Sequence, residues 1–402
     1  MKKNIKIKII IFAFLIHITT MKKIFFPIVL CLLLTAQFIT QPLFSQIRGK
    51  IDIPDLKGYV TLKCDFHMHT VFSDGTVWPT VRIDEAYREG LDAISITEHL
   101  EGRRYLQEIE RLTDFSFKNL SHHISYDIAQ PYAKEKGIML IRGSEISRSM
   151  PPGHFNAIFL ANSDELNKPD YMDAFRAAKA QKAFIFWNHP GWLSQQPDVT
   201  LWWPEHTQLL EQGMMHGIEV AGNSAYQYYP EAHRWCLEKK LTMIGNSDAH
   251  PPIETHMELA SVQHRTMTFV FARNASVEAI YEALNERRTA VYWKEFIIGE
   301  EKYLKELFEN ALEWKVEKTK NVVNVTVKNK SDLIFHLKPT NHDPRIVYFR
   351  NLTVEPFTIA PQSVKTFTVR LLEGKQNGDV NFCVENFLVQ PNTGMNYTLK
   401  IE

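Results

Sequence analysis

The chain has 402 residues, of which 45% are hydrophobic and 23% are charged; this is an ordinary globular composition, long enough to bury a core without disulfide bonds. The formal charge is zero, but six lysines lie in the first 45 residues, which contain no Asp or Glu. Without that segment, 40 basic and 46 acidic side chains remain, a charge of −6. Broad nucleic-acid binding needs a basic surface, so we expect no stable nucleic-acid partner.

The first 45 residues have the pattern of a bacterial export signal. Met21 opens a Met-Lys-Lys sequence, an apolar run follows over Ile24–Leu34, and Ser45 is a small residue at the expected cleavage position. Residues 1–20 hold a second Lys-rich, apolar stretch, so Met21 is an alternative start. We predict an exported protein, periplasmic or secreted, with no membrane segment after cleavage. The alternative is a retained membrane anchor.

Strand and helix patterns then alternate along most of the chain. Short apolar runs predict strands at Tyr59–His69, Leu91–Thr97, Ile138–Gly143, Phe155–Leu160, Ala183–Trp187, Gly217–Val220, Leu241–Gly245 and Thr268–Ala272. Amphipathic patterns predict helices between them at Pro79–Gly90, Asp170–Gln181, Tyr229–Lys240 and Ser276–Arg287. Such alternation indicates parallel strand pairing in a barrel or an open sheet.

The composition changes near residue 320. A helix pattern over Glu300–Trp314 precedes short alternating segments, which Asn, Asp, Pro and Gly separate. These segments are Val322–Lys328, Ile346–Phe349, Phe357–Ile359 and Val364–Leu371. They favour a small antiparallel β-sandwich. We therefore divide the chain into a signal peptide (1–45), a metal-binding barrel (46–298), a helical linker (299–319) and a β-sandwich domain (320–402).

Ionisable side chains gather at the carboxyl ends of the predicted strands. His67 and His69 lie two residues apart on the first strand, so both imidazoles leave the same face and can chelate one metal ion. Active sites of α/β barrels lie at these strand ends. Burying so many ionisable groups without a cation would cost on the order of several kcal/mol. We predict a metal centre at these strand ends, with nine His, Asp and Glu side chains as its ligands.

The motifs that carry these ligands resemble one known family. In chain order they are His-Met-His at 67–69, Ser-Asp-Gly at 73–75, Thr-Glu-His at 97–99, Gly-Ser-Glu at 143–145, Gly-His at 153–154, Asn-His-Pro at 188–190 and Ser-Asp-Ala-His at 247–250. The set spans about Tyr59 to Ala290 and resembles the PHP (polymerase and histidinol phosphatase) family. The resemblance implies an α/β fold, a distorted (β/α)7 barrel, here followed by the small C-terminal antiparallel β-sandwich. The signal and the β domain are also similar to a secreted phosphodiesterase branch, the Sphingobium type.

The resemblance also implies how three divalent ions would be held. It assigns His67, His69 and Asp248 to the first ion, and Asp74, His99 and His250 to the second. His154 and His189 would bind the third ion, and Glu145 would bridge the first and the third. The family sometimes has His where this chain has Asp74, which bears on metal preference. Imidazole and carboxylate ligands without thiolate suit Mn, Zn or Fe.

Hydrolysis of a small-molecule phosphate ester is the activity that the resemblance implies, with a hydroxide that bridges metal ions as the nucleophile. Asp248, His250 and Glu145 are the expected catalytic residues, and Glu145 would position the metal ions without attacking phosphorus itself. Arg148 and Asn223 follow strand ends and are the candidate substrate contacts.

A phosphodiesterase is favoured, and two alternatives stay open. A phosphomonoesterase of the same family would place extra cations around the phosphate dianion. The candidates for that role are Arg103, Arg104, Arg142 and Arg148. A non-catalytic exported binding module would lose ligands, whereas all nine positions are occupied here. Tryptophans after the fifth strand either pack internally or stack on an aryl or nucleoside leaving group: Trp187, Trp192, Trp202 and Trp203. The oligomeric state is left open.

Overall fold

The computed structural model describes residues 47–103, 120–222, 227–256, 264–340, 343–348 and 356–402. Arg48–Glu402 forms one compact unit. The predicted signal peptide, Arg104 and Asn223 lie outside the described residues. None of the helices in the described part of the chain is both long and apolar enough to cross a membrane.

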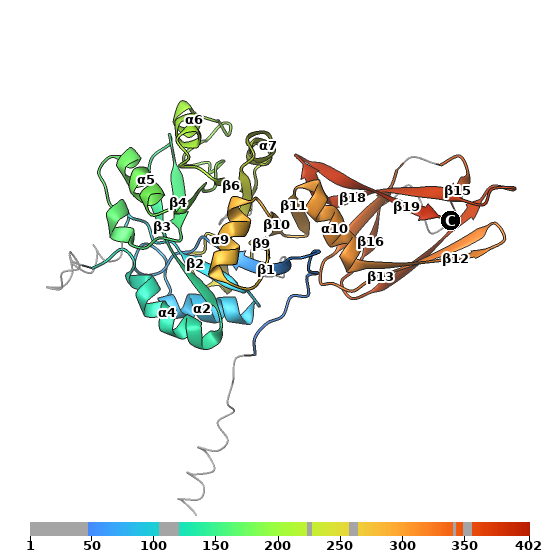
Figure 1. Cartoon of the computed structure of the whole chain (residues 1–402), viewed down its shortest axis with the longest axis horizontal. Coiled ribbons are helices and arrows are strands. Elements are labelled where there is room, and N and C mark those ends of the chain that lie inside the picture. Colours follow the sequence, from blue (N-terminus) through green and yellow to red (C-terminus); the bar gives the residue numbers. More distant parts are fainter. Residues whose placement is uncertain (1–46, 104–119, 223–226, 257–263, 341–342, 349–355) are drawn as a thin grey trace, which may run out of the picture. The chain divides into compact units, whose positions relative to one another are not determined.

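Seven of the described strands form a barrel (Figure 1). They are β1 (Val60–Asp65), β2 (Ala93–Ile96), β3 (Met139–Ser147), β4 (His154–Ile158), β5 (Phe184–Trp187), β6 (Gly217–Gly222) and β8 (Thr242–Asn246). Strands next to each other in this order are hydrogen-bonded, and all pairs are parallel except those that β4 makes with β3 and β5. Just beyond β1 and β8 the ring closes, where Met68 bridges Ala249 in parallel. The predicted (β/α)7 barrel is confirmed, with β4 as its distortion.

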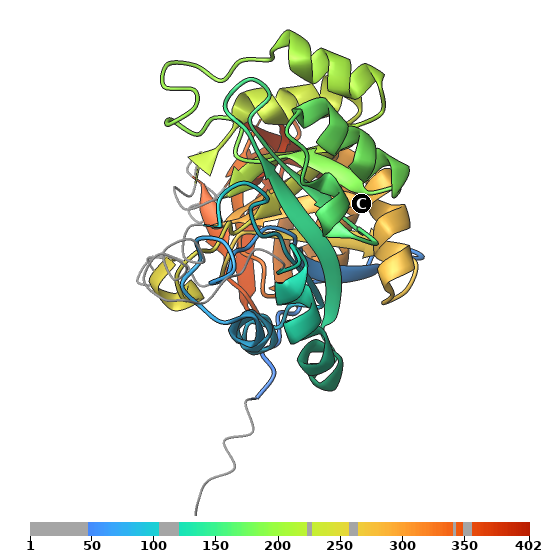
Figure 2. The same cartoon turned by 90° about the vertical axis from the view of Figure 1, so that its left-hand side faces the viewer.

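Helices surround the ring of strands, as Figures 1 and 2 show. They are α2 (Pro79–Arg88), α4 (Ile124–Lys136), α5 (Tyr171–Ala180), α6 (Pro204–Glu211), α7 (Pro230–Lys239) and α9 (Val277–Asn285). Three of them begin with proline, whose missing N–H leaves no bond unmade in the first turn. Because helices cover the outside and side chains fill the inside, β2, β5, β6 and β8 are buried along their whole length.

Three further strands extend the sheet away from the barrel. β9 (Met267–Ala272) pairs antiparallel with β1, β10 (Thr289–Trp293) with β9, and β11 (Phe296–Gly299) with β10. β11 then pairs in parallel with β18 (Gly378–Gln390) of the C-terminal domain. One continuous sheet therefore links the two domains. The two domains also share a hydrophobic core. Leu304 and Phe308 of α10 (Glu301–Ala311) belong to one apolar cluster with residues of both domains.

The C-terminal domain packs two antiparallel sheets against each other. In the first, β14 (Phe335–Pro339) lies between β16 (Phe357–Ile359) and β18, which also pairs with β19 (Thr393–Ile401). The second has the order β12-β13-β17-β15, and its strands are β12 (Leu312–Thr319), β13 (Val322–Asn329), β17 (Val364–Leu371) and β15 (Ile346–Tyr348). Side chains alternate between core and solvent, as Val323, Val325 and Val327 of β13 do. This is the predicted β-sandwich.

The segment predicted as a helical linker, 299–319, needs a correction. Its first half is helix α10, but its second half is β12, which pairs with β13 along its whole length from Leu312 to Thr319. The alternation of Trp314 and Val316 with charged residues explains this, because a period of two suits a strand with one face on the core.

Candidate metal centre

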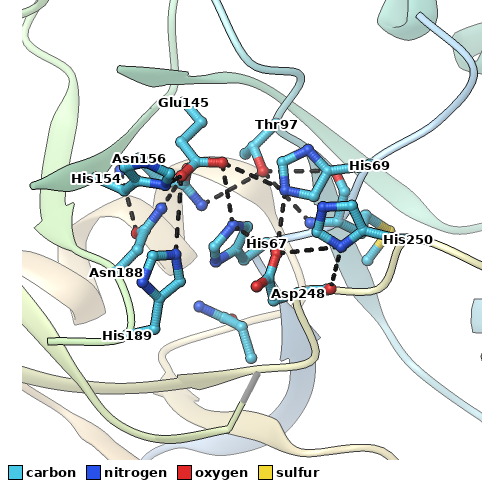
Figure 3. A network of polar contacts seen from close by, with 12 residues as sticks. His67, His69, Thr97, Glu145, His154, Asn156, Asn188, His189, Asp248 and His250 are labelled. Atoms are coloured by element: carbon cyan, nitrogen blue, oxygen red, sulfur yellow. Dashed lines mark hydrogen bonds and ion pairs between the residues drawn. The ribbon is translucent and has the colours of Figure 1, made fainter. Parts of the chain in front are cut away.

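The carboxyl ends of the barrel strands bring all nine predicted ligands into one cluster. Figure 3 labels His67, His69, Glu145, His154, His189, Asp248 and His250 among them. In four overlapping groups, every member offers a ligand atom within 4.8 Å of the ligand atoms of the others. The groups are His69 with Asp74, His99 and His250; His67 with His69 and Glu145; His67 with His189 and Asp248; and His99 with Glu145 and His154. Because the groups share members, they form one centre rather than separate sites.

Glu145 lies in the middle of the cluster, fully buried at the end of β3. Its Oε2 is 3.4 Å from His67 Nε2 and 3.3 Å from His69 Nε2, while its Oε1 is 2.7 Å from His154 Nδ1. His189 Nε2 is 4.0 Å from that same Oε1. The two carboxylate oxygens therefore serve two different sets of histidines, as a bridging ligand would.

Two aspartates complete the cluster on either side of His69. Asp248 Oδ1 lies 3.1 Å from both His67 Nε2 and His69 Nε2. Asp74 Oδ1 lies 3.3 Å from His99 Nε2 and 3.3 Å from His250 Nε2. The imidazole of His69 packs against those of His99 and His250, with ring centroids 4.4 and 4.3 Å away, and the centroids of these two rings are 6.2 Å apart. His69 thus stands between the group around Asp248 and the group around Asp74.

Several buried atoms of the cluster lack a hydrogen bond, which tests whether cations fit there. His67 Nε2, both carboxylate oxygens of Glu145, His154 Nδ1 and His189 Nδ1 have no hydrogen-bond partner among the described residues. The short N···O distances around Glu145 are therefore ion-pair contacts without hydrogen-bond geometry. Leaving so many buried polar atoms unpaired is costly, and divalent cations would satisfy them together. The donor set, imidazole nitrogen and carboxylate oxygen without sulfur, suits Mn, Zn or Fe.

The electrostatics of the cluster point the same way. Burial raises the pKa of Asp248 to about 6, although His67 and His250 act to lower it. For His69, burial lowers the pKa well below its usual value, and repulsion from His250 and His99 adds to this. Burial acts to raise the pKa of Glu145, but the surrounding histidines outweigh it and hold that pKa well below its usual value. Burial acts to lower the pKa of His67 and of His99 as well, but the neighbouring carboxylates outweigh it and raise that pKa well above its usual value. A bound cation would therefore displace a proton from each of these two imidazoles, because imidazole binds a metal ion in its neutral form.

Two ligands sit on strained backbone. His189 and Asp248 have positive φ angles of 28° and 52°. Non-glycine residues adopt this region at a cost of roughly 1–3 kcal/mol, and such strain collects at functional sites. The loop with Asp74 is also tightly placed, because a side-chain carbon on Gly75 would lie 2.5 Å from the carbonyl carbon of His69. Only glycine lets this loop approach β1 closely enough to bring the Asp74 carboxylate into the cluster.

Glu219 of β6 belongs to the site, although its position in the sequence did not indicate this. It is buried, and its Oε1 lies 2.9 Å from His67 Nδ1. Its Oε2 accepts a hydrogen bond from the His189 amide over 2.7 Å, and Asn246 donates to its Oε1 over 2.9 Å. A carboxylate at Nδ1 fixes the proton there and leaves Nε2 free for a metal. A glutamate inside an otherwise apolar buried strand is the signal that could have revealed it.

Arg82 of α2 holds together the segment that carries His69 and the segment that carries His250. Its guanidinium is fully buried. It donates to four carbonyls over distances of 2.8–3.0 Å, those of His69, Ala249, His250 and Pro251. Glu85, one turn further along α2, balances its charge at 2.7 Å. The sequence suggested nothing of this, because an arginine on an amphipathic helix is normally solvent-exposed.

A pocket of about 240 Å³ opens onto the cluster. It is lined by Asp74, His99, His154, His189, Trp192, Asp248 and His250. Six of these seven are predicted ligands, and none of the lining residues, all from the described part of the chain, is Lys or Arg. His67, His69 and Glu145 are fully buried beneath.

The predicted substrate contact Arg148 does not line this pocket. Its guanidinium binds Glu101 at 2.7 Å and donates to the carbonyls of Lys168 and Pro169. Two other candidate arginines also donate to carbonyls. Arg103 donates to Leu120 and Ser121, and Arg142 donates to Ala161. Each of these three arginines thus donates to carbonyl groups of other residues of the chain.

Known structures and families were compared with this fold and site. A family model described as an Ig-like domain matches residues 309–400. Among solved structures, the chain is similar to a two-domain protein from Bacteroides vulgatus, described as containing a predicted PHP-like metal-dependent phosphoesterase. The two are 51% identical over 89% of this chain and 99% of that one, with a TM-score of 0.82. The chain belongs to the PHP-like family.

Other similarities to this PHP protein are weaker. A protein from Bifidobacterium adolescentis, described as a metal-dependent phosphoesterase, is 16% identical over 46% of this chain and 87% of that one, with a TM-score of 0.36. An amidohydrolase from Chromobacterium violaceum is 15% identical over 47% of this chain and 88% of that one, with a TM-score of 0.34. A comparison with curated proteins finds no match.

Proposed function

We propose that this PHP protein is a metal-dependent phosphoesterase that hydrolyses phosphodiesters of small molecules at a centre of three divalent ions. The pocket lining carries the proposal. A phosphate monoester is a dianion near neutral pH, and sites for it commonly use Arg or Lys. The described lining offers ligands for cations and Trp192, but neither of those cationic residues. Such a lining suits the single charge of a phosphodiester.

The nine predicted ligands, His67, His69, Asp74, His99, Glu145, His154, His189, Asp248 and His250, would hold the ions. When bound, divalent ions supply an acidified water and offset negative charge on the phosphate group. The chain's own residues hold this arrangement in place. Glu219 fixes the tautomer of His67, and Arg82 fixes the backbone that carries His69 and His250. Glu145 orients two sets of histidines and is too deeply buried to reach phosphorus.

The division of ligands among three ions is part of the proposal. Asp74, His99 and His250 belong to one group of neighbouring ligand atoms, which supports their assignment to one ion. His69 belongs to the same group. Glu145 as a bridge agrees with its two oxygens serving different histidines. We expect three equivalents of Mn, Zn or Fe per chain by elemental analysis. We further propose that the chain acts after export, as its first 45 residues predict.

Initial rates test the reaction. The purified chain, loaded with Mn²⁺, is assayed with bis(4-nitrophenyl) phosphate and with 4-nitrophenyl phosphate. We expect kcat/KM for the diester to exceed that for the monoester at least tenfold, about 1.4 kcal/mol. A faster monoester would make the protein a phosphomonoesterase. Metal binding without turnover of either ester would favour the non-catalytic binding module.

A further inference from the structure

The four tryptophans after β5 have different environments, and three of them are structural. Trp187 is fully buried, and its ring lies 3.8 Å from that of His206. Trp202 packs on Trp187 and donates its indole N–H to Thr207 over 2.8 Å. Trp203 immediately precedes α6 and directs its indole N–H toward Gln196 at 3.4 Å. These contacts explain three of the four without any ligand.

Trp192 differs, because it lines the pocket over the metal centre. Its ring centroid lies 5.2 Å from that of His189 and 5.7 Å from that of His154, at interplanar angles of 69° and 58°. Neither imidazole therefore stacks parallel on the indole. The side chain is 36% exposed, although tryptophan is a residue that normally gains from burial. An indole beside predicted metal ligands thus keeps part of its apolar surface open to the pocket.

The loop around Trp192 is held firmly in place. The Trp192 amide donates to the His189 carbonyl over 2.9 Å, and the Gln196 amide donates to the Trp192 carbonyl over 2.8 Å. The buried side chain of Gln196 donates to the Pro190 carbonyl over 2.6 Å and accepts from the Leu201 amide over 2.9 Å. A loop that is already ordered loses little backbone entropy when a ligand stacks on a side chain that it carries.

We propose that Trp192 is the binding surface for an aromatic arm of the phosphodiester, so that aryl or nucleoside diesters are the preferred substrate class. This inference rests on the proposed function. A phosphate group held by the ions must direct its ester arms along the remaining lining. Trp192 is the one described lining residue that is not a predicted ligand. A planar arm matches an indole face, and stacking of this kind tolerates different rings.

Binding measurements test this without depending on turnover. Calorimetry of the Mn²⁺-loaded chain compares two phosphinates, methylphenylphosphinate and dimethylphosphinate, which carry the single charge of a diester but have no ester bond to hydrolyse. We expect the phenyl compound to bind about tenfold more tightly to the native chain, within the range that stacking on an aromatic side chain provides. Trp192→Ala should reduce this preference to less than about twofold, and Trp192→Phe should keep part of it.

Leu193→Ala is the matched control, because Leu193 is the next residue, is 61% exposed and does not line the pocket. It should keep the full preference. Equal binding of the two phosphinates by the native chain would overturn the inference, and so would an unchanged preference in both Trp192 variants. If the native chain prefers the phenyl compound but hydrolyses no diester, the proposed function fails while the stacking surface stands. If it hydrolyses diesters without that preference, only the inference about Trp192 fails.

Discussion

The metal-binding end of the barrel and the C-terminal domain are built on opposite principles. At the barrel end, Glu145, His67 and His69 are all fully buried with ionisable groups against one another. In the C-terminal domain, the buried positions of β13 and β17 are valine, phenylalanine and leucine, apart from Asn329 at the end of β13, and the charged residues of these strands point outward. Burial of apolar area stabilises the C-terminal domain. At the barrel end, surrounding hydrogen bonds hold the ionisable groups in place against the cost of their desolvation and mutual repulsion. Function therefore depends on the region that folding favours less.

The largest expected effect comes from removing a charge within the cluster. Asp248→Asn keeps the shape but loses the negative charge that lies 3.1 Å from both His67 and His69. We expect metal binding and hydrolysis to fall by more than about a hundredfold, beyond what changes to outer partners of a metal site produce. Elemental analysis and initial rates measure this. An Asp248→Asn protein with full metal content and the native rate would contradict the ligand assignment.

Arg82→Met should lower the free energy of unfolding by about 3–5 kcal/mol, because it leaves Glu85 buried without its partner and four carbonyls without a donor. Metal affinity should fall too, since the His69 and His250 segments lose their common anchor. Urea unfolding of the metal-free protein and metal titration measure the two effects. Arg88→Met on the same helix is the control: its ion pair with Glu254 is exposed and should contribute at most about 1 kcal/mol.

A matching test removes a buried side chain from the C-terminal domain. Phe382 is fully buried in the sandwich, and its ring lies near those of Phe357 and Phe367. Phe382→Ala should also cost about 3–5 kcal/mol, but it should leave metal affinity of the folded protein unchanged. If Arg82→Met and Phe382→Ala affect metal binding alike, the site is not separately organised from the rest of the fold.

A smaller effect is expected at Glu219. Glu219→Gln keeps one acceptor oxygen, for either His67 Nδ1 or the His189 amide, and removes the negative charge that makes the imidazole a better ligand. Metal affinity should fall about 10–100-fold, and the loss of one buried hydrogen bond should lower the stability of the metal-free protein by about 1–3 kcal/mol. Competition with a chelator of known affinity measures it. Unchanged affinity would show that Glu219 only supports the fold.

The smallest effect concerns pH and lies outside the cluster. Burial lowers the pKa of His206 to about 4, although its bond to the Pro152 carbonyl opposes this. The unfolded state therefore takes up a proton first, and stability is lost as pH falls from about 6.5 towards 4. His206 should account for about 2 kcal/mol of the loss between pH 7.5 and pH 5. Urea unfolding of metal-free native and His206→Gln proteins at both pH values tests this; equal losses would contradict it.

The sequence predicted well which side chains gather in the cluster, because each comes from a short motif at the end of a strand. Two side chains of one motif, such as His67 and His69, are placed by local geometry alone. Their outer partners could not be predicted in this way. Glu219 and Arg82 reach His67 and the His250 segment across 152 and 168 residues of sequence, and such contacts depend on the complete fold. The same reason explains Arg148, whose partners are loop carbonyls that no pattern records.

Strands of the C-terminal domain were predicted unevenly. β13 and β17 alternate cleanly, but β18 and β19 were not predicted. In β18, Val380, Phe382 and Val384 alternate, and then Asn386 falls at a buried position. That asparagine donates to the carbonyls of Glu295 and Ile334, one on each side, where the barrel sheet joins the sandwich. A polar residue with a structural role at a junction thus interrupts the pattern that identifies a strand.

The pairing of β11 with β18 has a consequence for how this protein can be divided or inherited. Without β18, β11 would be an open edge whose free N–H and C=O groups invite pairing with another chain. The apolar cluster that α10 shares with both domains would be cut as well. The barrel is therefore not a portable catalytic module. A gene fragment that ends near residue 300 should yield a self-associating product, and recombination should tend to transmit the two domains as a pair.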